Sequence, residues 1–254
     1  MKLKKIISFA LCLAIVFAFA GCSKSNTASN QSTSEKQEVK SVVPTVIQST
    51  EYTLYQNIFM NNQGKDYDNT AVTKKGTFAV INDEYNSVVR YFVWGYNDQT
   101  KCCDWQWELD PKDKENLPTA GSLVEVSGTF KEAESSLDGY WIENAAISVL
   151  QKYNGNSCDI DMTTMGGTLE RVQVANMQQY PDRFEGKTIC AYGRMETLTS
   201  LQHPYYDNCF SLEFESENQA PAIGTDTIIR GKYSGSKIVN ATITEDAQYN
   251  QVIV

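Results

Sequence analysis

Two adjacent cysteines, Cys102 and Cys103, stand just before the segment 104–109, whose alternating residues include Trp105 and Trp107. Successive side chains of a strand point to opposite faces, so the tryptophan face predicts that Cys103 points into a core and Cys102 outward. Two thiols on opposite faces cannot bind one ion, and a bond between them would need a strained ring. We therefore expect Cys103 to pack as a small apolar residue.

The best metal-ligand set in the sequence is an outward Cys102 with Asp104 and Cys209. Zinc sites usually take four ligands, and the chain has one histidine and no C-x-x-C motif. A metal-handling surface protein is therefore the alternative function, and no metal or other cofactor is the main expectation. Disulfide bonds persist outside the cytoplasm, so the cysteines that follow residue 22 could form long-range disulfides. These cysteines are Cys102, Cys103, Cys158, Cys190 and Cys209.

Motifs for catalysis are missing from the sequence. His203 lies in the turn-like "LQHPYYDN" without a recognisable partner nucleophile, and there is no G-x-S-x-G, P-loop or H-E-x-x-H motif. The acids Glu108, Glu213 and Glu215 are expected on solvated strand faces; Glu108 and Glu213 lining one cleft would instead favour an enzyme. We predict a protein that is not an enzyme.

The N-terminus has the pattern of a signal peptide. Lys2, Lys4 and Lys5 precede the apolar run 6–20, which is shorter than the roughly 20 residues that span a bilayer. The following Gly21-Cys22 resembles the lipobox of bacterial lipoproteins, which implies a signal peptide over residues 1–21, lipidation of Cys22 and a cell-membrane location on the extracytoplasmic face. The alternative is cleavage after the A-x-A sequence at 18–20 by an ordinary signal peptidase.

Residues 22–50 are rich in Ser, Thr, Asn, Gln and Lys, which predicts a disordered tether. Loss of the three N-terminal lysines changes the formal net charge from -9 to -12. An acidic chain with scattered basic residues is a poor partner for a phosphate backbone, so we expect no nucleic-acid binding. Anionic lipids would also repel it, so its membrane contact is expected through Cys22.

The remaining chain contains one pattern twice. A Pro-x-x-Gly is followed seven residues later by another glycine in both copies (Pro118, Gly121, Gly128 and Pro221, Gly224, Gly231). "CCDWQWELD" aligns with "CFSLEFESE", which pairs Cys102 with Cys209. Short alternating segments with glycine at bends predict a mainly β fold: two tandem five-stranded barrels of the OB type at 51–151 and 160–254. A short helix is expected before each, near 51–62 and 167–180, the second with Leu169, Val172, Ala175 and Met177 on one side.

Barrels of this type bind ligands on the face of strands two and three and at the flanking loops. Aromatic side chains there could stack on a sugar ring or an apolar peptide. The loop aromatics that fit this description are Tyr96, Tyr205 and Tyr206. They are the candidate ligand-binding residues.

The stretches "MQQYPDRFEGKTICAYGRM" and "RYFVWGYNDQTKCCDWQWEL" resemble OB-fold domains of uncharacterised bacterial membrane-associated proteins, some of which accompany predicted two-gene permeases. The resemblance covers roughly residues 72–150 and 168–246. It implies an OB-like fold, an extracytoplasmic location and a partner in the membrane. The expected function is a membrane-anchored, non-catalytic binding or partner module, accessory to a membrane transporter.

Overall fold

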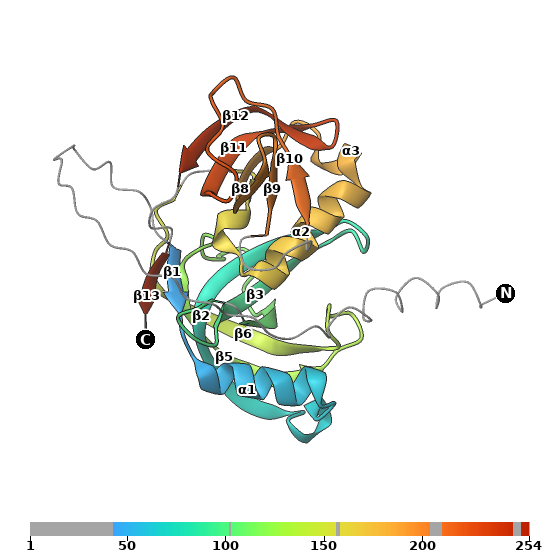
Figure 1. Ribbon diagram of the computed structural model, residues 1–254. Helices are drawn as coiled ribbons and strands as arrows, with labels where there is room; N and C mark the ends of the chain where they lie inside the picture. Colours follow the sequence, from blue (N-terminus) through green and yellow to red (C-terminus); the bar gives the residue numbers. More distant parts are fainter. Residues whose placement is uncertain (1–42, 102, 156–157, 204–209, 246–249, 254) are drawn as a thin grey trace. The chain divides into compact units, whose positions relative to one another are not determined.

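The computed structural model describes residues 43–101, 103–155, 158–203, 210–245 and 250–253 (Figure 1). All described residues belong to one compact unit. The fold is mainly β, as predicted. The predicted signal segment with Cys22 lies outside the described residues, as do Cys102, Cys209, Tyr205 and Tyr206.

The first half of this unit is a closed five-stranded barrel with the order β2-β3-β4-β6-β5. Its strands are antiparallel neighbours except for the parallel pair β4–β6. The elements of this half are β1 (Val43–Val46), α1 (Ser49–Tyr55), the π-helical η1 (Gln56–Met60), the 3-10 helix η2 (Gly64–Asp66), β2 (Thr70–Asp83), β3 (Val88–Tyr96), β4 (Asp104–Pro111), β5 (Leu123–Glu132) and β6 (Tyr140–Gln151).

The second half forms a sheet with the order β10-β9-β8-β11-β12, and β7 pairs with β8. This half begins with β7 (Ile160–Asp161), the 3-10 helix η3 (Met162–Thr164), α2 (Gly167–Gln179) and α3 (Pro181–Phe184). Its other strands are β8 (Thr188–Thr197), β9 (Ser200–Gln202), β10 (Ser211–Glu213), β11 (Asp226–Ser234), β12 (Lys237–Glu245) and β13 (Asn250–Ile253), which pairs with β1.

The predicted second barrel is present in part. The two outer strands of its sheet meet through a single parallel bridge between Phe214 and Ile238, and Glu215 exchanges backbone hydrogen bonds with Ile238 and Ala241. These contacts join the third and fifth strands of the repeat, as β4 and β6 are joined in the first half. The described sheet therefore repeats the pairing of the barrel without a continuous ladder at the closing seam.

The glycine landmarks confirm that the two halves share one local structure. Gly121 and Gly224 have positive φ angles of 88° and 87°, and each donates its N–H to a carbonyl of the first strand of its repeat, at Phe78 in β2 and at Met195 in β8. A Cβ at Gly128 would lie 2.6 Å from Ile142 Cγ2 and 2.7 Å from a backbone oxygen. At Gly231 the corresponding distances, to Ile238 Cγ2 and a backbone oxygen, are both 2.6 Å.

The alignment of the third strands was wrong by two residues. Leu109 pairs with Ile142, whereas Phe214 pairs with Ile238, and these two isoleucines are the equivalent contacts of Gly128 and Gly231. Leu109 is therefore equivalent to Phe214. With this alignment of the two copies, Cys209 corresponds in sequence to Asp104 and not to Cys102. A shift of two residues keeps every side chain on its face, which is why alternation alone could not detect it.

The inward face of β4 was predicted correctly. Trp105, Trp107 and Leu109 are buried in the barrel core, beside Val124, Phe130 and Ile142. The outward face was not, because Asp104, Gln106 and Glu108 are buried as well. Cys103 precedes β4 and is half-buried, with its carbonyl accepting the Asn97 N–H, so it lies at the entrance to the strand and not in the core.

The second hydrophobic core joins the two halves. It contains Phe92, Trp94 and Tyr96 from the outer side of the first barrel together with Met162 and Leu169 from the second half. The predicted boundary near 152–161 covers the connection from β6 to β7 and β7 itself, but the segments at 51–151 and 160–254 share this core. The cross-link Cys158–Cys190 also fastens the connecting segment to β8.

Two further expectations need correction. The predicted tether reaches residue 50, but β1 lies at Val43–Val46 and α1 begins at Ser49, because Thr45 and Val46 are buried against the barrel. Helices are present in both predicted segments. On α2, however, Ala175 is exposed while Glu170 and Gln173 are buried. These two polar residues are buried because α2 packs against β2 of the first half as well as its own sheet.

Matched alanine substitutions test the repeat. Gly128→Ala and Gly231→Ala should each destabilise the protein by about 2 kcal/mol or more, because a new methyl group would overlap backbone on the facing strand. Gly235→Ala has open space and only the strain of a positive φ, so about 1 kcal/mol is expected there. Urea unfolding measures all three; equal losses would contradict the shared packing role.

Candidate functional site

The hairpin between β2 and β3 presents the clearest candidate contact surface among the described residues. Tyr85, Val88 and Val89 are 68%, 44% and 49% exposed, although all three are large apolar side chains. The turn is closed by Asp83, whose carboxylate accepts the N–H and the side-chain amide of Asn86. Val88 and Val89 are consecutive in β3, so their side chains point to opposite faces and the hairpin exposes apolar groups on both of its sides.

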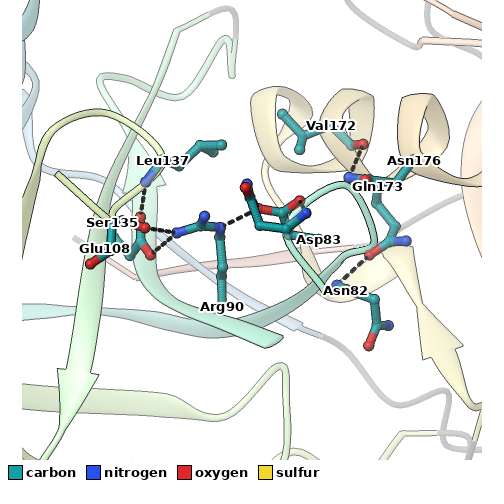
Figure 2. Close-up of polar contacts among 10 residues, drawn as sticks. Asn82, Asp83, Arg90, Glu108, Ser135, Leu137, Val172, Gln173 and Asn176 are labelled. Carbon is teal, nitrogen blue, oxygen red and sulfur yellow. Dashed lines mark hydrogen bonds and ion pairs between the residues drawn. The ribbon is translucent and has the colours of Figure 1, made fainter. Parts of the chain in front are cut away.

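A buried ion network holds the base of this hairpin (Figure 2). Arg90 Nε donates to Asp83 Oδ2 at 2.6 Å, and Arg90 Nη1 donates to Glu108 Oε1 at 2.7 Å. The same Nη1 donates to the Ser135 carbonyl at 2.8 Å, and Leu137 N–H donates to Glu108 Oε2 at 2.5 Å. Arg90 therefore ties the hairpin to the middle of β4 and to the loop between β5 and β6.

The pKa values of the two carboxyl groups in this network are shifted in opposite directions. Burial acts to raise the pKa of Asp83, but hydrogen bonds from Asn86 and Arg90 outweigh it and hold that pKa below its ordinary value. For Glu108, burial outweighs the hydrogen bonds from Leu137 and Arg90, and its pKa is raised. Both oxygens of each carboxylate accept at least one hydrogen bond, so the network is suited to holding the hairpin base in position.

A second anchor comes from the other half of the molecule. Gln173 of α2 accepts the backbone N–H of Asn82 at 3.0 Å, one residue before the ion network begins (Figure 2). Asn82 faces Val89 across the hairpin. The hairpin is thus held on one side by the β5–β6 loop and on the other by α2, so its exposed residues project from a fixed base.

Asp104 does not form a ligand site with other acids or thiols in the described structure. It is buried and accepts the N–H and the hydroxyl of Thr168, at 2.8 and 2.7 Å, in the first turn of α2. Burial raises its pKa, against these hydrogen bonds. Across the described residues, no group of three or more His, Cys, Asp and Glu side chains is arranged to hold a metal.

The other predicted residues are distributed through the fold. Tyr96 lies in β3, and it is buried with its ring against Trp94, so it belongs to the shared core and not to a binding loop. Glu213 is exposed on β10, whereas Glu108 is buried in the ion network, so the pair does not line one cleft. His203 is buried against Gly167 and Phe210, and burial, with a contribution from Arg171, lowers its pKa to about 4.

Sequence patterns missed Glu170, the buried acid of α2. Its carboxyl accepts a backbone hydrogen bond from Tyr192, its Oε1 has no hydrogen-bond partner, and burial raises its pKa well above the ordinary value. It sits three residues before Gln173, so both polar side chains follow one side of the helix. The only signal was a pair of polar residues at helical spacing, which also describes an exposed face.

No protein-family model fits the chain, and no curated protein is significantly similar to it. Within its described residues, the chain has no helix that is both long and apolar enough to cross a membrane.

Removal of the central charge tests the hairpin anchor. Arg90→Met should destabilise the protein by about 3–5 kcal/mol, because it leaves two buried carboxylates without their counter-ion. Adding Glu108→Gln to that variant should recover part of the loss, since glutamine can still accept the Leu137 N–H. Urea unfolding of both variants gives the comparison, and a double variant less stable than the single one would contradict the assignment.

Glu170→Gln tests the buried acid of α2. A raised folded-state pKa means that the unfolded chain loses its proton first, so stability falls as pH rises above the ordinary glutamate range. The variant keeps the acceptor for Tyr192 and should match the parent near pH 4. At pH 7 it should be more stable by about 1 kcal/mol or more, since one pKa unit corresponds to about 1.4 kcal/mol. The exposed Glu125→Gln should change stability by less than about 0.5 kcal/mol at either pH; an equal gain there would refute the assignment.

Proposed function

We propose that this chain is a lipid-anchored, extracytoplasmic binding module that contacts a membrane protein and performs no catalysis. The main observation in support of this proposal is the hairpin tip, where the apolar Tyr85, Val88 and Val89 are exposed on a firmly anchored base. A surface fixed before binding loses little conformational freedom in the complex, which favours recognition of a protein partner. The lipobox-like Gly21-Cys22 supports a location at the membrane surface.

The arrangement of the barrel also supports contact over ligand chemistry. The strand order β2-β3-β4-β6-β5 with one parallel pair favours the OB-type barrel that the sequence suggested. In such barrels the face of the second and third strands and the adjacent loops commonly bind ligands. Here Trp94 and Tyr96 of that face are packed in the core that the halves share, and Asp104 caps α2. A partner is therefore expected at the hairpin tip.

The membrane partner is the part of the proposal that the permease resemblance suggests. A chain held by acyl chains at Cys22 meets membrane proteins at high local concentration. An accessory subunit of a transporter needs an anchor and a fixed contact surface, and it needs no reaction of its own. In this proposal, Cys22 is the anchor and the hairpin is the contact surface.

Site-directed photo-cross-linking in intact cells, followed by separation of the membrane and aqueous fractions, tests both elements. A photoreactive phenylalanine analogue in place of Tyr85 should form an adduct with an integral membrane protein in intact cells, whereas the analogue in place of the exposed Glu217 should not. Cys22→Ala should move the chain to the aqueous fraction and remove the adduct. Continued membrane association of Cys22→Ala after signal cleavage would reject the lipid anchor, and equal adducts from both positions would reject the hairpin surface.

A further inference from the structure

The last part of β6 is a strand edge without a neighbour on one side. β4 pairs with β6 at Leu109–Ile142 and Pro111–Ala145, and the Lys112 N–H to Ala145 carbonyl bond follows directly. β5 continues along the opposite side of β6 as far as Gln151. Among the described residues, no strand pairs with residues 146–151 on the side that β4 leaves.

The direction of the backbone groups follows from the last bond. The Ala145 carbonyl points to the side of β4, where it accepts from Lys112. Backbone groups alternate between the two edges of a strand, and the register with β5 is regular from Ala146 to Val149. The N–H and C=O groups of Ile147 and Val149 therefore point to the open edge, one residue on either side of Ser148.

The side chains along this edge are suited to being covered. Residues 146–151 contain no charge and no proline, the features with which proteins usually protect an exposed edge. Val149 and Leu150 are 43% and 48% exposed. A half-open hollow of about 480 Å³ lies beside the edge, between residues 112–117 and 145–147. The edge therefore combines unpaired backbone groups, apolar side chains and space for a neighbour.

We propose that this edge pairs with the same edge of a second copy of the chain, antiparallel about a two-fold axis at Ser148. The axis places Ile147 opposite Val149 of the other copy, and Val149 opposite its Ile147. Both residues direct their backbone groups outward, so each pair exchanges two hydrogen bonds, and the two barrels share four. The continuous strand between the barrels is a self-complementary contact.

The side chains agree with the symmetric pairing. The two-fold axis brings the exposed Leu150 of one copy beside the small Ala146 of the other, at the hollow that Ala146 lines. Because residues 146–151 are uncharged, no like charges face each other between the two paired strands. An identical strand thus meets the backbone spacing, the charge and the size requirements together. The pairing is independent of the proposed anchor and hairpin contact, since it uses neither.

Cysteine cross-linking of the complete chain in isolated membranes tests this pairing. Ser148→Cys places two thiols on the axis, in a non-hydrogen-bonded pair whose Cα atoms lie roughly 4.5 Å apart. Under mild oxidation its disulfide dimer should form at least ten times faster than that of Ser127→Cys, an exposed position on the neighbouring β5. The parent chain supplies the background from its own cysteines.

A second substitution separates edge pairing from collision. Val149→Lys in the Ser148→Cys chain should reduce dimer formation to the Ser127→Cys rate, while the uncharged Val149→Thr should leave it within about twofold; both variants should melt like the parent. The same ratios are expected for the chain released by Cys22→Ala at matched concentration, which keeps this test separate from the anchor. Equal rates at positions 148 and 127, insensitivity to Val149→Lys, or cross-linking at position 148 to a protein of different mass would overturn the proposal.

Discussion

The buried contact of Arg90 with Asp83 and Glu108 is the constraint on which the candidate surface depends. Moving three charges out of water costs several kcal/mol for each, and only close geometry with satisfied hydrogen bonds offsets that cost. The geometry requires the hairpin base, β4 and the β5–β6 loop to hold fixed positions relative to one another. An apolar tip attached to this base cannot fold back against the barrel, so it stays at the surface.

Buried polar contacts also explain why the two halves are not independent domains. Asp104 of the first half receives the first-turn donors of α2, and Trp94 Nε1 donates to the Thr164 carbonyl just before that helix. The side of the first barrel that carries Asp104 is thereby committed to the second half. The second half therefore covers one side of the first barrel, which leaves turns and strand edges as surfaces through which this unit can contact partners.

Alternation in "WQWEL" was enough to predict which side chains enter the barrel, because a strand with a core on one face must bury every second residue. It could not predict the fate of Glu108, since burial of the second face depends on a distant loop and on Arg90. The prediction that Tyr96 lies in a binding loop was wrong for the same reason, because its neighbour Trp94 packs against residues more than sixty positions later in the chain. The glycines succeeded because backbone approach at Gly128 and Gly231 is a local requirement, and local requirements are visible in a sequence.

The hairpin and the open edge of β6 lie at opposite ends of the first barrel's strands. Arg90 contacts Ser135 in the loop that leads into β6, whereas Ser148 is eight residues beyond the start of that strand at Tyr140. At about 3.3 Å per residue, the two surfaces are separated by roughly 25 Å along β6. A second copy at the edge therefore leaves the hairpin tip of each copy accessible. Two-fold pairing would present two hairpins at once, and a partner with two equivalent sites would bind such a pair more tightly than a single chain.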